Sequence, residues 1–207
     1  MGLPFCLTSE GMSMENGKII VINGTSSSGK TSIVYALQNM LEEPFLEAGI
    51  DKFIFMMPER YLDRPLWDDV LGQATKSGMA GHALIAGMHR AIRALSLSGV
   101  NVIADHVLVE EVWVKECAEL FADLPAYLVG VQCPLETLEQ RERSRKNRTL
   151  GQARAQFEVI HKILSTIWKW TLLCSVQMSV LNASEPDYLD RHKHSGRCGN
   201  DIIYLCE

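Results

Sequence analysis

Short apolar runs alternate with helical patterns between Lys18 and His161. The apolar runs that we interpret as strands are Ile19–Ile22, Phe45–Ile50, Val100–Ala104 and Tyr127–Gln132. The segments that we interpret as helices are Ile33–Leu41, Gly81–Ser98, Glu110–Leu120 and Gln152–His161. Strands and helices that alternate in this way build a parallel sheet with right-handed crossovers. The pattern therefore predicts an α/β fold with a doubly wound parallel sheet.

A glycine-rich loop follows the first predicted strand. The eight residues Gly24, Thr25, Ser26, Ser27, Ser28, Gly29, Lys30 and Thr31 match G-x-x-x-x-G-K-[ST] at every fixed position. The N–H groups of such a loop surround a phosphate, and the following helix adds positive dipole character. Lys30 would reach the β/γ-phosphates, and the Thr31 hydroxyl would ligate Mg²⁺. A Ser/Gly linker can match this pattern by chance, but the flanking strand and helix favour a nucleotide-binding loop.

The second and third predicted strands each end in a carboxylate, Asp51 and Asp105. Ligands of open parallel sheets bind at the carboxyl ends of the strands. Asp51 could take a proton from an acceptor hydroxyl, or it could cap a helix that begins at Lys52. Asp105 could hold Mg²⁺ through water, or it could form a structural pair with His106. Position alone leaves both pairs of alternatives open.

An arginine-rich segment follows the fourth predicted strand. Arg141, Arg143, Arg145 and Arg148 alternate with glutamates, which is compatible with a solvated helix laced with ion pairs. The alternative is a lid that closes over a triphosphate and supplies guanidinium groups to the transferred phosphoryl group. Because a phosphate loop lies upstream, we favour the lid, with Gly151 as its far hinge.

Composition narrows the class of protein. The chain has 207 residues, of which 47% are hydrophobic and 22% charged, as in an ordinary single globular domain. Its net charge of −5 argues against a nucleic-acid partner. Ile163–Leu181 is long enough for a membrane span, but Lys169 and Gln177 make one unlikely to insert. The six cysteines lack metal-type spacing and indicate a reducing compartment, so a cytoplasmic protein is expected.

Two histidines in the second predicted helix, His82 and His89, are a further candidate for metal binding. They are seven residues apart and lie on one helical face, but no third ligand is evident in the sequence. We therefore interpret them as solvated or capping side chains. The sequence does not indicate an oligomeric state.

Several blocks in order resemble the chloramphenicol phosphotransferase family, which comprises P-loop kinases with a shikimate-kinase-like fold. The blocks are INGTSSSGKTSIV, LEEPFLEAGID, MMP, VIADHVL, VGVQCPLETLEQRERSR and the region of Arg148. The resemblance implies a three-layer sandwich that takes ATP and Mg²⁺ and phosphorylates a hydroxyl of a small molecule, with a role in antibiotic resistance. It also implies that Asp51 is the catalytic base.

The family's lid arginines fall in the same arginine-rich segment. Arg148 is the best match to the catalytic one, and Arg141 and Arg145 are the other expected contacts to the nucleotide. Lys146-Asn147 stands where a Gly-Asp pair often precedes that arginine. The expected activity is thus an ATP-dependent phosphotransferase. The alternative is a nucleotide-binding protein without catalysis, or an inactive product that is damaged at its C-terminus.

The C-terminal tail departs from the family. Members continue with a strand of the type Tyr-Asp-apolar-Glu-Val-Asp-Thr, whereas Ile163–Leu181 has neither strand alternation nor a helical period. This pattern is compatible with a sheet that lacks the final edge strand. The shifted reading frame across Ser165–Thr171, however, permits Tyr-Asp-Met-Glu-Val-Asp. We therefore expect a disordered extension at 1–17, where Met1 or Met14 could be the start, a phosphotransferase domain at 18–162, and an atypical tail at 163–207 that is a candidate for out-of-frame translation.

Overall fold

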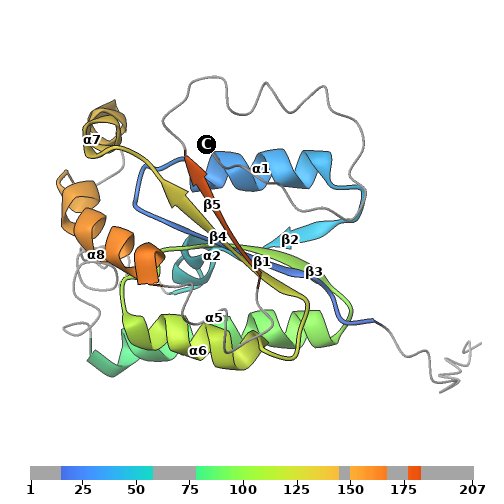
Figure 1. Cartoon of the computed structure of the whole chain (residues 1–207). Helices are drawn as coiled ribbons and strands as arrows, with labels where there is room; N and C mark the ends of the chain where they lie inside the picture. Colours follow the sequence, from blue (N-terminus) through green and yellow to red (C-terminus); the bar gives the residue numbers. More distant parts are fainter. Residues whose placement is uncertain (1–14, 58–77, 145–149, 167–176, 183–207) are drawn as a thin grey trace, which may run out of the picture.

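The computed structural model contains a five-stranded sheet in which every neighbouring pair of strands is parallel (Figure 1). The structure describes residues 15–57, 78–144, 150–166 and 177–182. The strands are β1 (Ile19–Gly24), β2 (Phe45–Glu47), β3 (Asn101–His106), β4 (Ala126–Gln132) and β5 (Gln177–Asn182). Their order is β2-β3-β1-β4-β5, so the strand that leads into the glycine-rich loop lies at the centre.

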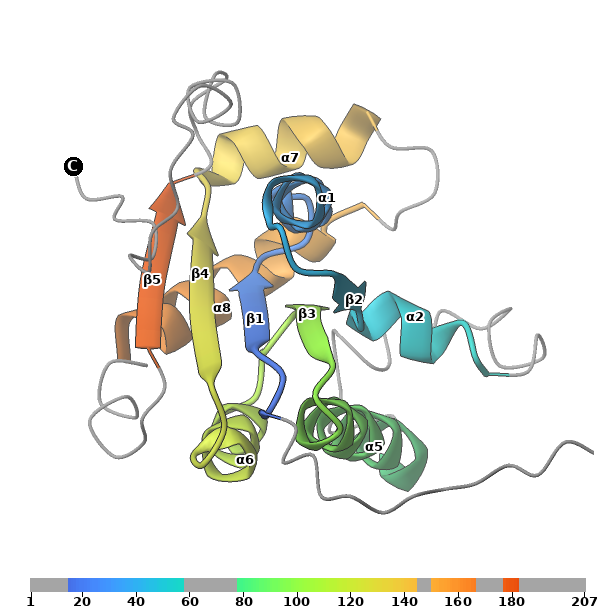
Figure 2. The same ribbon diagram turned by 90° about the vertical axis from the view of Figure 1, so that its right-hand side faces the viewer.

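Helices cover both faces of this sheet (Figure 2). They are α1 (Lys30–Met40), α2 (Ile50–Ile54), α5 (Gly78–Leu97), α6 (Glu111–Phe121), α7 (Leu135–Ser144) and α8 (Gln152–Thr166). Helix α1 lies over one face, and α5 and α6 lie under the other, which gives three layers. The α/β class, the doubly wound parallel sheet and the three-layer arrangement predicted from the sequence are confirmed.

The residues of β1 supply both halves of the core because successive side chains point to opposite faces of a sheet. Ile19 and Val21 belong to the larger apolar cluster, which holds buried residues of α2, α5, α6 and α8. Ile22, with a fully buried side chain, belongs to the smaller cluster, where it packs with Ile33 and Val34 of α1. The uninterrupted apolar run of β1 therefore reflects a strand that is covered on both sides.

The second predicted strand is shorter than expected. We predicted a strand over Phe45–Ile50, but β2 ends at Glu47 and Ile50 begins α2. Gly49 takes an extended conformation just before the helix. A Cβ on Gly49 would lie 3.2 Å from the carbonyl oxygen of Asp105, so the turn passes tightly against β3. Asp51 consequently lies in the first turn of α2, and the expectation that it ends a strand is wrong.

The segment after residue 162 also differs from the sequence-based expectation. Helix α8 continues to Thr166, and Gln177–Asn182 forms β5, which pairs in parallel with β4 from Tyr127↔Gln177 to Gln132↔Asn182. A final edge strand is thus present, and the expectation of no regular pattern over 163–181 is wrong for these two stretches. Residues 167–176 and 183–207 of the expected tail lie outside the described residues.

At the other end of the chain, residues 1–14 of the expected extension also lie outside the described residues. Gly17 is buried and its N–H donates to the carbonyl oxygen of Ser96 at 2.8 Å. No helix within the described ranges is both long and apolar enough to cross a membrane.

Candidate active site

The predicted phosphate loop forms a tight turn between β1 and α1. A Cβ on Gly24 would lie 2.8 Å from the Val131 carbonyl oxygen of β4, so a larger residue would displace the loop from the sheet. Ser27 and Gly29 take left-handed backbone conformations, with φ of 66° and 98°. Thr25 is 1% exposed, so its side chain is buried within the loop. The eight motif residues therefore build one compact turn at the carboxyl end of the central strand.

Buried polar atoms gather at this turn. The hydroxyl oxygens of Ser26, Ser27 and Ser28 have no hydrogen-bond partner among the described residues. From α8, Gln156 accepts a hydrogen bond from the Ser26 N–H at 2.9 Å through its Oε1, while its Nε2 is likewise unpaired within the described part of the chain. A buried polar group without a partner is costly, and phosphate oxygens would supply the missing partners. The loop therefore fits an anionic phosphate ligand.

Lys30 and Thr31 link the loop to the end of β3. The Lys30 ammonium group donates to the carbonyl oxygens of Gly24 and Thr25 at 2.9 and 3.1 Å. It also lies 3.7 Å from Asp105 Oδ1. The Thr31 hydroxyl donates to Asp105 Oδ2 at 2.9 Å. Lys30 and Thr31, which are adjacent in the sequence, thus lie beside Asp105, which is 74 residues beyond Thr31.

The oxygens of Thr31 and Asp105 are of the kind that Mg²⁺ prefers. No group of three or more His, Cys, Asp or Glu side chains in the described ranges could hold a metal ion by itself. Magnesium in phosphoryl-transfer sites characteristically uses one or two protein oxygens together with phosphates and water. The hydroxyl and the carboxylate therefore fit Mg²⁺ that arrives with a nucleotide.

Asp51 and Asp105 line one cavity of about 200 Å³. The cavity lies where α1, the end of β2, α2 and the end of β3 meet, and its full lining is Thr31, Tyr35, Glu47, Gly49, Asp51, Lys52, Phe55 and Asp105. Within it Lys52 lies 3.3 Å from Glu47. The predicted base and the predicted magnesium-side residue therefore face the same space, although Asp51 reaches it from a helix rather than from a strand end.

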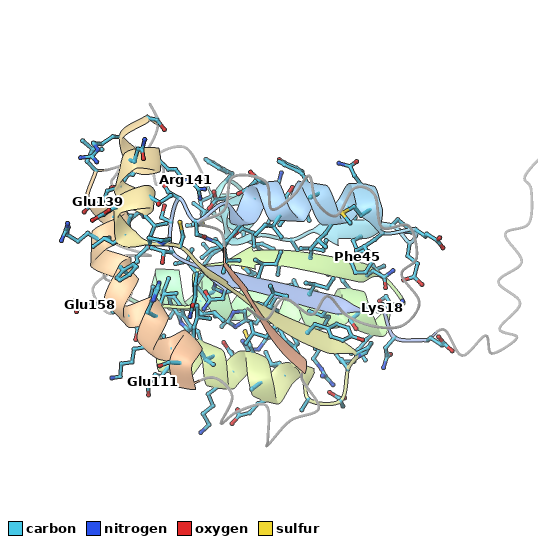
Figure 3. All side chains as sticks on the ribbon, turned by 45° about the horizontal axis from the view of Figure 1, so that its top comes forward. Lys18, Phe45, Glu111, Glu139, Arg141 and Glu158 are labelled. Atoms are coloured by element: carbon cyan, nitrogen blue, oxygen red, sulfur yellow. The ribbon has the colours of Figure 1, made fainter. Side chains whose placement is uncertain are left out.

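Of the four arginines of the predicted lid, the structure describes Arg143, which is exposed on α7, and Arg141, which is partly buried there. Arg141 Nη1 donates to the Ser28 carbonyl oxygen at 3.3 Å and lies 3.7 Å from Cys133 Sγ. Figure 3 shows Arg141 between α7 and the near end of α1. Arg145 and Arg148 lie outside the described residues. The guanidinium group of Arg141 therefore lies against the phosphate loop at the carbonyl oxygen of Ser28.

The Glu142 carboxylate, 3% exposed, was not singled out from the sequence. Its two oxygens accept hydrogen bonds from the N–H groups of Gly151 and Ala153, both at 2.9 Å. A carboxylate at a helix N-terminus satisfies free N–H groups and complements the helix dipole. Glu142 therefore holds the start of α8 against α7. The sequence gave no signal of this role, because Glu142 belongs to α7 and its partners lie at the start of a different helix, α8.

Two histidines behind the site also differ from expectation. His89 of α5 is fully buried, so our interpretation of it as solvated or capping is wrong. Its Nδ1 lies 2.8 Å from Glu116 Oε2, and its Nε2 lies 2.9 Å from Nε2 of His106, the residue after Asp105. Burial lowers the pKa of His89 despite the neighbouring Glu116. Burial, with His89 and Lys30 as smaller causes, lowers the pKa of His106 well below its usual value.

His82, by contrast, is partly buried and packs edge-on against Trp113, with ring centroids 6.2 Å apart. The spacing of apolar residues in α5 correctly predicted which face of the helix is buried. It could not reveal that a histidine on this face finds partners on β3 and α6.

Comparison with known proteins agrees with this geometry. Two Mycobacterium tuberculosis proteins, from strains CDC 1551 and H37Rv and each named "Putative O-phosphotransferase", are 35% identical to the chain over 161 residues, covering 72% of this chain and 72% of each relative. Two solved structures share the fold, each with a TM-score of 0.52. Shikimate kinase from Acinetobacter baumannii, in complex with shikimate, is 16% identical, and the match covers 86% of this chain and 92% of that one. A gluconokinase from Sinorhizobium meliloti 1021 is 17% identical, with 86% and 87% covered.

The family that matches is the chloramphenicol phosphotransferase-like protein family, over residues 17–167. This range contains the phosphate loop, the cavity residues Asp51 and Asp105, and all of α8. It ends close to residue 162, where the sequence-based resemblance stops. The family resemblance inferred from the sequence blocks is confirmed. The chain therefore belongs to the chloramphenicol phosphotransferase-like proteins, a family with the fold of P-loop kinases.

Proposed function

We propose that the protein transfers the γ-phosphoryl group of ATP to a hydroxyl group of a small molecule. The observation that carries the proposal is the shared cavity: Asp51 and Asp105 line it together with Thr31 of the phosphate loop. Phosphoryl transfer depends mainly on positioning and charge stabilisation. A phosphate loop, a magnesium-side carboxylate and a base facing one space satisfy this requirement.

The donor side holds the phosphates. The unpaired serine hydroxyls and the loop N–H groups fit phosphate oxygens, and Lys30 exchanges its contacts with its own loop carbonyls for the β/γ-phosphates. Mg²⁺, when bound, neutralises charge that develops on the phosphate oxygens. Thr31 and Asp105 are the side chains that would hold it. Arg141 adds positive charge behind the loop, and Arg148 and Arg145 are the further guanidinium groups that we assign to the nucleotide.

The acceptor side supplies the base. Asp51 takes the proton of the acceptor hydroxyl while the hydroxyl oxygen of the acceptor bonds to the γ-phosphorus. The bond between the γ-phosphorus and the β–γ bridging oxygen breaks, and ADP is released. Tyr35 and Phe55 border the cavity with large exposed surfaces, 50% and 62%. They provide flat apolar contact for an acceptor with an aromatic or aliphatic part.

Chloramphenicol is the first acceptor to test, because the family takes its name from the phosphotransferase of that antibiotic. We place the reaction in the cytoplasm, where ATP is supplied, and assign it a role in antibiotic resistance if the acceptor is an antibiotic. The described cysteines, Cys117 and Cys133, are free thiols, which fits a reducing compartment.

The test is a transfer assay with [γ-³²P]ATP and a panel of hydroxylated compounds that includes chloramphenicol, shikimate and gluconate. We expect label on at least one acceptor, dependent on Mg²⁺ and formed roughly 10²–10⁴-fold more slowly with Asp51→Asn. Release of ADP in a coupled assay without any labelled acceptor would contradict the assignment. Transfer at an unchanged rate in Asp51→Asn would contradict it as well.

The alternative is a protein that binds nucleotide without catalysis, or a product damaged at its C-terminus. The observation in its favour is that the family match ends at residue 167. ATP would then raise the melting temperature while no acceptor is labelled. The proposed phosphotransferase requires both the thermal shift and the turnover.

A further inference from the structure

The buried chain of His106, His89 and Glu116 has one consistent pattern of protons. The Val107 N–H donates to His106 Nδ1 at 2.7 Å, so this nitrogen is the acceptor and the His106 proton is on Nε2. The Nε2–H then donates to His89 Nε2 at 2.9 Å. The remaining His89 proton, on Nδ1, donates to Glu116 Oε2 at 2.8 Å. Every ring nitrogen of both neutral imidazoles is therefore satisfied, and the order of donors has a single direction.

The network of His106, His89 and Glu116 connects two helices, α5 and α6, to the end of β3. His106 is the last residue of β3, His89 belongs to α5, and Glu116 belongs to α6, where Arg90 Nη1 also binds it at 2.9 Å. The same strand end is fixed from the other side, because Asn23 Oδ1 of β1 accepts the Leu108 N–H at 2.8 Å. The backbone that carries Asp105 thus has a hydrogen-bonded anchor on each side of it.

Asp105 and His106 are consecutive strand residues, so their side chains point to opposite faces of the sheet. Asp105 meets Thr31 and Lys30 on the site face, and His106 meets His89 on the buried face. A shift of the His106 ring moves the peptide that the two residues share. A buried polar network in which every group is paired defines one arrangement, whereas an apolar contact permits several. Two fully buried imidazoles are costly in an apolar core, and an apolar pair could fill the same space.

We infer that His106, His89 and Glu116 are positioning residues that hold Asp105 where it can share Mg²⁺ with Thr31. The inference rests on the proposed function, since it requires that Asp105 faces the metal. None of the three residues contacts substrate in this scheme. Their effect reaches the site through the backbone of β3, as outer partners of metal ligands tune a metal site elsewhere.

The test compares the affinity of the protein for Mn²⁺, in the presence of a non-hydrolysable ATP analogue, between the wild type and His89→Leu. Electron paramagnetic resonance of free Mn²⁺ gives this affinity without turnover. We expect the Mn²⁺ dissociation constant to rise about tenfold, the lower range for lost outer partners. The Mg²⁺ concentration for half-maximal transfer should rise by the same factor, while KM for the acceptor stays constant.

Three further variants separate positioning from folding. His89→Gln offers both an amide oxygen for His106 and an amide N–H for Glu116, so it should restore most of the metal affinity. Met88→Leu changes a neighbouring, fully buried residue of the same helix and should leave the affinity unchanged. Glu116→Ala alters a partly exposed position, 23% at the side chain, and should weaken Mn²⁺ binding by a smaller factor than His89→Leu. It tests the inference even if His89→Leu fails to fold.

Two results would overturn the inference: a folded His89→Leu or Glu116→Ala protein with wild-type Mn²⁺ affinity, or an equal loss of affinity in Met88→Leu. A wild-type protein that binds no Mn²⁺ with the ATP analogue would instead contradict the proposed function. The two failures are therefore distinguishable.

Discussion

The two halves of the candidate site are built in different ways. The donor half consists of β1, the loop from Gly24 to Thr31 and the start of α1, so one uninterrupted segment provides it. The acceptor half consists of the end of β2, α2 and Tyr35 of α1, and Asp105 at the end of β3, which we assign to Mg²⁺, lies where the two halves meet. A contiguous half can be identified from a motif, whereas an assembled half depends on where each element ends.

The halves meet at the Thr31–Asp105 hydrogen bond and at the cavity that both line. Substitutions in the donor half should therefore remove the reaction with every acceptor. Substitutions in the acceptor half should act on proton transfer or on acceptor choice and leave ATP binding intact. This difference gives a separate kinetic signature for each half.

The largest expected effect is in the donor half. Lys30→Ala should abolish transfer to every acceptor, because the ammonium group is the cation that reaches the β/γ-phosphates. Circular dichroism should show an unchanged fold, since no apolar side chain of the core is removed. The measurement is label transfer from [γ-³²P]ATP, with Lys115→Ala on the exposed face of α6 as the matched control. Wild-type turnover in Lys30→Ala would refute the assignment of the loop.

The next effect is in the acceptor half. Asp51→Asn should reduce kcat by roughly 10²–10⁴-fold, which is the usual contribution of a positioned general base. The dissociation constant for ATP, measured by calorimetry, should hardly change. Asp123→Asn, a surface aspartate paired with Arg93, is the control and should retain full activity. A wild-type kcat in Asp51→Asn would contradict the role of base and leave Asp51 with a structural role in the first turn of α2.

A smaller effect is expected at the aromatic border of the cavity. Phe55→Ala and Tyr35→Ala should each raise KM for the acceptor by about tenfold, which corresponds to about 1.4 kcal/mol of apolar contact. KM for ATP should stay within error, because neither ring belongs to the phosphate loop. Steady-state kinetics with both substrates varied gives the comparison. Equal changes in the two KM values would show that the halves are not separable.

The protonation of His89 and His106 should lower the stability of the folded protein. Both pKa values are lowered in the folded protein, so their contribution is fully present above the unfolded-state pKa of about 6.5 and is lost as the pH falls below it. Urea unfolding at pH 8 and pH 5.5 should therefore give less stability in acid, with a slope of up to about 1.4 kcal/mol per pH unit for each histidine. Glu116, Arg90 and Lys30 are the charges that face the pair. An equal slope in His89→Leu would assign the loss to other groups.

The smallest effect on catalysis is expected from the tail, which we propose is translated out of frame after about residue 162. Restoring the other frame near that codon should raise the melting temperature by several degrees and increase soluble yield, because a strand with the family pattern would replace the present one. Turnover should change less than with any substitution above. Resequencing of the transcript decides the origin. Cooperative melting of the given chain, with a tail that resists proteolysis, would contradict this proposal.

The sequence was sufficient for the α/β class and for the position of the glycine-rich loop. The motif fixed the loop, and the apolar runs located four of the five strands. It was insufficient where tertiary contacts decide the outcome. Gly49 ends β2 early because the turn passes against Asp105, and no local pattern marks that contact. We interpreted His89 as a surface residue because a helical period shows which face of a helix is buried. It does not show which polar partners, here His106 and Glu116, lie opposite that face.

The strand order also bears on how such a gene can change. Among the described strands, β5 pairs with β4 alone, and β4 separates it from β1 and the loop. A segment that reaches the sheet at this position can be exchanged for an unrelated one with similar strand-forming capacity, while the strands that carry the chemistry keep their neighbours. The position of β5 is therefore the part of this architecture in which new sequence can be tried at the lowest risk to the reaction.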